Sequence, residues 1–131
     1  MKKGIIIALA VFSLGFTACS QSAEENMTEA GITQTVKRVN KSEFKQYLSE
    51  HPDVQLIDVR TPGEYAGGTI EHAKNIDYNG ADFKTEINKL DKSAPVLIFC
   101  MSGGRSGRAL QLMDELGFEY VLELAGGYRS Y

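Results

Sequence analysis

One stretch decides the fold: Val96-Leu97-Ile98-Phe99-Cys100-Met101-Ser102-Gly103-Gly104-Arg105-Ser106. Its first four residues are apolar and predict a buried strand. The two glycines then allow a tight loop with positive φ. A helix is predicted from Ser106 to Leu116, where Gly117 stops it. A strand that passes through a glycine-containing loop directly into a helix is typical of an α/β fold.

The rest of the chain continues the alternation of strands and helices. Strands are predicted at 36–39, at 54–58, within 70–76, at 96–99 and at 120–124. Helices are predicted after a capping box at Asn40 and Glu43, over a long segment with Phe83, Ile87 and Leu90, and at 106–116. The fold class is therefore α/β, a mostly parallel sheet of about five strands with helices on both faces. Ligands bind such sheets at the carboxyl ends of the strands, which is where Cys100 stands.

Cys100 lies where the central strand ends and the next helix begins. Loop amides and the positive end of a helix make an anion site, and a thiol placed there ionises readily. Arg105 and Arg108 are the only charged residues between Lys92 and Asp114. Cations are unfavourable at a helix amino end, so their position indicates a function. The alternative is a buried, inert cysteine beside arginines that face solvent.

The first residues predict an export signal. Lys2 and Lys3 precede an apolar run at 5–16, and small residues follow it. This order is typical of a secretory signal peptide, predicted here at residues 1–18. The alternative is an uncleaved membrane helix, but a spanning helix needs about 20 apolar residues and this run is shorter.

A cysteine stands directly after this signal. Phe16-Thr17-Ala18-Cys19 resembles the lipobox of bacterial lipoproteins, in which the cysteine becomes the lipidated first residue of the mature chain. Leu is usual where Phe16 stands, and an ordinary signal peptide is the alternative. The resemblance implies a protein of the bacterial cell envelope that faces the periplasm and meets the membrane only through its lipid, and Ser20 favours the outer membrane. Polar residues 19–34 then predict a flexible tether to a domain at 35–131.

The charge of the chain excludes one class of partner. Residues 1–18 hold two of the 14 basic residues and none of the 17 acidic ones, so the mature chain has a net charge of −5. A protein that binds nucleic acid needs a basic face, so no nucleic-acid partner is expected. His51 and His72 do not stand at a metal-ligand spacing, so neither a metal nor another cofactor is expected.

Four motifs resemble those of the rhodanese-like domain family and follow the family's order across residues 35–131. They are I-D-V-R-x-x-x-E-Y at 57–65, G-x-I-x-x-A-x-N-I at 68–76, C-x-x-G-x-R-S at 100–106 and L-x-G-G at 124–127. Thr69 stands where the family often has His, and His72 close by is given no catalytic part.

The resemblance implies a sulfurtransferase. Cys100 would take the outer sulfur of thiosulfate or a similar donor as a persulfide and pass it to cyanide or a thiol acceptor. The implied partners are a small sulfur-containing anion and a thiol. Loop amides would hold the persulfide anion, and Arg105 would attract the anionic donor. The implied substrate-binding residues are Met101, Ser102, Gly103, Gly104, Arg105 and Ser106.

Three other functions are alternatives to sulfur transfer. Phosphatases of the same fold place five residues between Cys and Arg, whereas four separate Cys100 from Arg105, and the smaller ring favours sulfur over a phosphoryl or arsenate group. Domains of this family sometimes lose activity and serve as binding modules. A thiol of low pKa also suits a redox sensor.

Upstream, Arg60 is expected to pair with Glu64 and to brace the turn beneath the loop.

Overall fold

The computed structural model describes residues 33–131, and both the predicted signal peptide and the predicted lipidation site at Cys19 lie outside them. The strands are β1 Thr35–Val39, β2 Gln55–Asp58, β3 Lys74–Asn75, β4 Val96–Phe99 and β5 Tyr120–Leu124. The α-helices are α1 Lys41–Glu50, α2 Pro62–Ala66, α3 Phe83–Ile87 and α4 Gly104–Glu115. A short 3-10 helix, η1, spans Tyr128–Ser130.

The strands form one parallel sheet in the order β1-β5-β4-β2-β3. All four residues of β4 are buried, as their continuous apolar run predicts for a strand covered on both faces. The predicted α/β class and the five-stranded parallel sheet are confirmed. Since every strand runs the same way, all carboxyl ends meet at one edge of the sheet, and Cys100 directly follows β4 at that edge.

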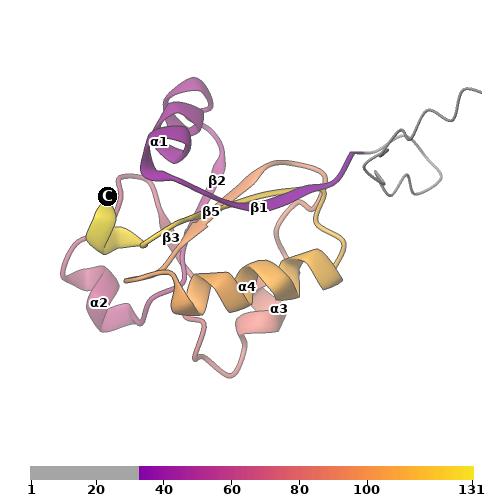
Figure 1. Cartoon of the computed structure of the whole chain (residues 1–131). Coiled ribbons are helices and arrows are strands. Elements are labelled where there is room, and N and C mark those ends of the chain that lie inside the picture. Colours follow the sequence, from indigo (N-terminus) through magenta and orange to yellow (C-terminus); the bar gives the residue numbers. More distant parts are fainter. Residues whose placement is uncertain (1–32) are drawn as a thin grey trace, which may run out of the picture.

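Alternate strand residues supply two hydrophobic cores, one on each face. In Figure 1, α1 lies on one side of the strands and α3 and α4 lie on the other. The α1 core contains Phe44, Leu56, Leu97 and Leu122, and the α3/α4 core contains Ile87, Ile98, Met113 and Val121. Because successive strand residues point to opposite faces, the four apolar residues of β4 serve both cores.

The predicted long helix through Leu90 is wrong. The α-helix there ends at Ile87, and the chain continues with tighter bonds from Lys89 N to Glu86 O and from Leu90 N to Ile87 O. Leu90 still packs against the α3/α4 core, so the apolar spacing described burial correctly but not helix length. A 3-10-like turn keeps residues i and i+3 on one face, as an α-helix also does.

The helix starts also differ in detail from the prediction. Asn40 accepts a hydrogen bond from Glu43 N at 3.0 Å, but the Glu43 carboxylate pairs with Lys37 of β1, so only half of the predicted capping box forms. A complete capping box caps α2, between Thr61 and Glu64. Among residues 33–131, no helix has the length and apolar character needed to cross a membrane.

Candidate active site

The loop after β4 folds around the sulfur of Cys100. Gly103 N–H donates to Cys100 Sγ at 3.1 Å. Gly103 itself has φ 94° and serves as the N-cap of α4, a left-handed conformation that glycine adopts without strain. The first intrahelical bond runs from Gly107 N to Gly103 O. The amides of the first turn of α4 therefore lack helical partners and are free to bind an anion at Cys100.

The segment that follows β5 holds the other side of this loop. Tyr128 N donates to Cys100 O at 2.7 Å, and Arg129 N donates to Met101 O at 3.0 Å. Gly127 lies so close that a Cβ there would come within 2.4 Å of Cys100 O and 2.7 Å of Ser102 N. The second glycine of the last motif, Gly127, thus has a steric reason, since only glycine permits this backbone approach.

The environment of Cys100 favours its ionised form. Cys100 is only 1% exposed, and this burial raises the pKa of the thiol. Hydrogen bonds from the Ser106 hydroxyl and from the amides of Ser106, Ser102 and Gly103 lower it by more. The net pKa of Cys100 therefore lies below its usual value, as expected for a thiol that accepts several hydrogen bonds.

A buried carboxylate next to this loop was missed by the sequence analysis. Glu123 of β5 is fully buried, and its Oε1 accepts a hydrogen bond from Ser106 Oγ at 2.5 Å. Its Oε2 accepts from Arg38 Nε, and Arg38 Nη2 donates to Gly103 O at 2.8 Å. The available signal was an acidic residue inside the apolar strand 120–124, on the same face as the buried Val121.

The expected pair between Arg60 and Glu64 does not form. Arg60 is buried and binds Asp58, with Nη2 2.6 Å from Oδ2, and its guanidinium stacks on the ring of Tyr128. Glu64 instead accepts two hydrogen bonds from Arg105, at 2.7 and 2.8 Å. Arg60 thus pairs with a carboxylate two residues before it, whereas Glu64 pairs with Arg105 because α2 and α4 approach one another in the fold.

The Arg105–Glu64 pair fastens the first turn of α4 to α2. The hydrogen bond from Arg105 lowers the pKa of Glu64 to about 2, against the opposing effect of burial, and the Thr61 amide and hydroxyl add to the lowering. The positive charge of Arg105 is thereby balanced at the edge of the site. Of the other predicted loop residues, Ser102 and Gly104 are exposed, Met101 is half-buried, and Ser106 is buried behind Cys100.

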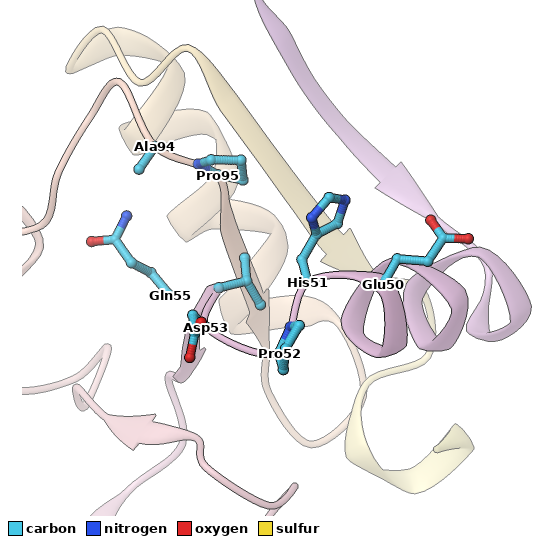
Figure 2. A pocket seen from close by; sticks show the side chains of 8 residues that line it. Glu50, His51, Pro52, Asp53, Gln55, Ala94 and Pro95 are labelled. Atoms are coloured by element: carbon cyan, nitrogen blue, oxygen red, sulfur yellow. The ribbon is translucent and has the colours of Figure 1, made fainter.

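A hollow of about 390 Å³ lies away from this loop (Figure 2). It is lined by Glu50, His51, Pro52, Asp53, Val54, Gln55, Ala94 and Pro95. These residues precede β4 or lie before and at the first residue of β2, so the hollow lies at the amino ends of the strands, whereas Cys100 follows the carboxyl end of β4. Within residues 33–131, the structure has no group of three His, Cys, Asp or Glu side chains placed to hold a metal.

Comparison with known sequences places this arrangement in a family. The model of the Rhodanese-like domain matches residues 40–131. The thiosulfate sulfurtransferase GlpE of Pseudomonas fluorescens is 35% identical over 97 residues, which cover 69% of this chain and 86% of that protein. A tRNA uridine(34) hydroxylase of Pelagibacter ubique is 30% identical, but the matched region spans only 40% of that longer protein.

Solved structures agree with the sequence comparison. A rhodanese-like domain protein from Staphylococcus aureus has a TM-score of 0.64 and 30% identity, over 72% of this chain and 89% of that one. The human single-domain sulfurtransferase TSTD1 has a TM-score of 0.58 and 30% identity, over 71% of this chain and 92% of that one. The loop geometry agrees with this family. Because the family model matches residues 40–131, this chain belongs to the rhodanese-like domain family.

Proposed function

We propose that this protein is a sulfurtransferase that carries sulfane sulfur as a persulfide on Cys100. The donor is thiosulfate or a similar sulfane compound, and the acceptor is cyanide or a thiol. One observation carries the proposal: Gly103 N–H donates to Cys100 Sγ at 3.1 Å, at the start of a helix whose first amides have no helical acceptor. Such a ring of donors stabilises charge on sulfur.

The reaction has two balanced steps. In the first, the Cys100 thiolate attacks the outer sulfur of thiosulfate, an S–S bond forms to Cys100, and the donor's S–S bond breaks with its electron pair leaving on sulfite. In the second, cyanide or a thiolate attacks the outer sulfur of the persulfide. The Cys100–sulfur bond breaks, its electron pair returns to Cys100, and thiocyanate or a new persulfide leaves.

The amides, rather than a free cation, are proposed to receive the charge of the outer sulfur. Arg105 is already bound by two hydrogen bonds to Glu64, so its role is to hold the first turn of α4 in place. Burial raises the pKa of Cys100, and the Ser106 hydroxyl together with the amides of Ser106, Ser102 and Gly103 lowers it by more. Fixed dipoles of this kind stabilise developing charge without having to reorganise.

The test is thiosulfate-dependent formation of thiocyanate by the full chain carrying Cys19→Ser, with Cys100→Ser added as the control. We expect activity only where Cys100 is present, together with a mass increase of one sulfur atom on Cys100 after exposure to thiosulfate. Equal background in both proteins would favour a binding module. A sulfenate or a mixed disulfide in place of the persulfide would favour a redox sensor.

A further inference from the structure

Glu123 is a buried carboxylate that the proposed reaction does not use. It is 0% exposed, and it comes from β5, the strand next to the one that ends at Cys100. Burying a carboxylate is costly unless each oxygen is paired. Here Oε1 accepts from Ser106 Oγ and Oε2 accepts from Arg38 Nε. Both oxygens of this fully buried group are therefore paired.

Ser106 has one hydroxyl proton and two possible acceptors. Its Oγ lies 2.5 Å from Glu123 Oε1 and 3.3 Å from Cys100 Sγ. A hydroxyl that donates to a carboxylate lies about 2.5–2.7 Å from it, so the first contact has the length of a charge-assisted bond. The single hydroxyl proton is therefore shared between two acceptors, and the shorter contact to Glu123 weakens the hydrogen bond from Ser106 to Cys100.

Three arginines near Cys100 are each paired with a carboxylate. On α4, Arg105 is held by Glu64 of α2, and at the carboxyl end of β2 Arg60 is held by Asp58. On β1, Arg38 is held by Glu123 itself. Glu123 thus differs from the other two carboxylates because a single hydroxyl links it to the reactive sulfur.

We propose that Glu123 is a positioning residue that draws the Ser106 proton away from Cys100 and so makes the thiolate less stable than the loop amides and a fully donating Ser106 hydroxyl together would make it. Glu123 does not exchange a proton with Cys100. It only provides a second acceptor for the hydroxyl proton of Ser106. The thiol proton of Cys100 can in turn be donated to the free lone pair of Ser106 Oγ. Glu123 therefore moderates the acidity that the amide ring confers.

This moderation suits the proposed sulfur transfer, and its value for catalysis rests on that function. The nucleophilicity of a thiolate falls as its pKa falls, and the most effective attacking thiol has a pKa near the ambient pH. If the amides and the Ser106 hydroxyl all stabilised the thiolate fully, Cys100 would be ionised but less nucleophilic. By drawing the Ser106 proton toward itself, Glu123 limits this loss of nucleophilicity.

The test is the titration of Cys100, followed by the ultraviolet absorbance of the thiolate in the full chain with Cys19→Ser. This measurement needs no sulfur donor, so it stays informative even if sulfur transfer is absent. We expect Glu123→Gln to titrate about one pH unit below the parent protein, because Ser106 can then donate to the thiolate, and a hydrogen bond to a charged group is worth about tenfold or more. The neutral amide oxygen of Gln is a weaker acceptor than sulfur anion.

Ser106→Ala, alone and combined with Glu123→Gln, completes a double-mutant cycle. Alone it should raise the midpoint by much less than one pH unit, because Glu123 weakens the hydrogen bond from this hydroxyl to Cys100. Added to Glu123→Gln it should raise the midpoint back by about one pH unit. Glu43→Gln, which removes a half-exposed carboxylate at the start of α1, is the matched control and should leave the midpoint unchanged.

Two results would overturn the proposal. One is an unchanged or raised midpoint in Glu123→Gln, which is what mere loosening of the loop would produce. The other is a rise of about one pH unit in Ser106→Ala alone, because it would show that Glu123 does not weaken the hydrogen bond from the hydroxyl to the thiolate. The second result decides the question even if Glu123→Gln fails to fold.

Discussion

Glu64 links two helices through one side chain. Its carboxylate accepts two hydrogen bonds from Arg105 of α4 and caps its own helix through Thr61. The resulting pKa of about 2 in the folded state lies below the value of about 4.3 in an unfolded chain. A carboxylate whose pKa falls on folding stabilises the fold above its unfolded pKa, and this contribution is lost as the pH falls through its folded pKa.

We therefore expect Glu64→Gln to lower the free energy of unfolding by about 1 kcal/mol at pH 7, since the pair is partly exposed and solvent screens it. The difference from the parent protein should shrink between about pH 4.3 and pH 2. Urea unfolding at pH 7, 4 and 2.5 measures it. Glu71→Gln, which removes an exposed carboxylate, is the control. A stability difference that does not depend on pH would show that the Glu64 charge is not its source.

Single residues were predicted well where local sequence decides their environment. Cys100 and the glycines of its loop were found because a strand end, a turn and a helix start are encoded within a few neighbouring positions. The partner of Glu64 was not found, because Arg105 is 41 positions away and reaches it only in the folded chain. The partner of Arg60 was also missed, because Asp58 and Glu64 both stand close to it in sequence and the spacing does not choose between them. Glu123 was missed because its partner Arg38 is 85 positions away.

At the scale of elements, the short segment after β5 positions the reactive loop. Gly127 has φ 62°, and a Cβ there would meet the backbone of Cys100, Met101 and Ser102 at 2.4–2.7 Å. The two backbone bonds from Tyr128 and Arg129 to this loop depend on that closeness. The geometry of the loop is therefore set jointly by α4 and η1.

We expect Gly127→Ala to cost about 1–2 kcal/mol for the left-handed backbone and about 1–3 kcal/mol for the displaced loop. Its rate of sulfur transfer should fall about 100-fold, because misplacing a catalytic group by about 1 Å has that effect. Thermal unfolding and the thiocyanate assay measure both. Gly63→Ala is the control, since a Cβ there meets nothing within 4 Å, and it should keep full activity. Full activity in Gly127→Ala would disprove the role of this contact.

Strands were predicted more accurately than helices. The apolar runs at 96–99 and 120–124 correspond to β4 and β5, because a continuous apolar run bounded by turns leaves little choice. The segment with Phe83, Ile87 and Leu90 was predicted too long, because spacings of three and four residues suit both an α-helix and the tighter turns that follow Ile87. The sequence pattern reports which residues are buried more directly than how the backbone between them turns.

At the scale of the whole molecule, alternation of strands and helices predicted the parallel sheet and hence the edge where Cys100 lies. It did not reveal which strands are neighbours. The placement of β5 between β1 and β4 brings Glu123 beside both Arg38 and the reactive loop. That order arises from packing across the two cores, which no local segment encodes.

The remaining whole-molecule prediction concerns Cys19, which lies outside the described residues. We propose that the mature protein is anchored to a bacterial membrane by lipid on Cys19, with the folded domain in the periplasm. The sequence before it supports this, since two lysines, a short apolar run and a cysteine follow one another. Two acyl chains suffice for a stable anchor, whereas one gives only marginal binding.

When the full chain is expressed in a bacterium, we expect the parent protein in the membrane fraction and Cys19→Ser in the soluble periplasmic fraction or held as uncleaved precursor. Mass spectrometry should find acyl chains on residue 19 of the parent only. Cys100→Ser is the matched control, because it removes the other cysteine and should leave fractionation unchanged. This result would show that membrane anchoring depends on Cys19 and not on the reactive thiol of Cys100. An unmodified Cys19 in a protein that still fractionates with membranes would contradict the lipid anchor and point to an uncleaved apolar segment instead.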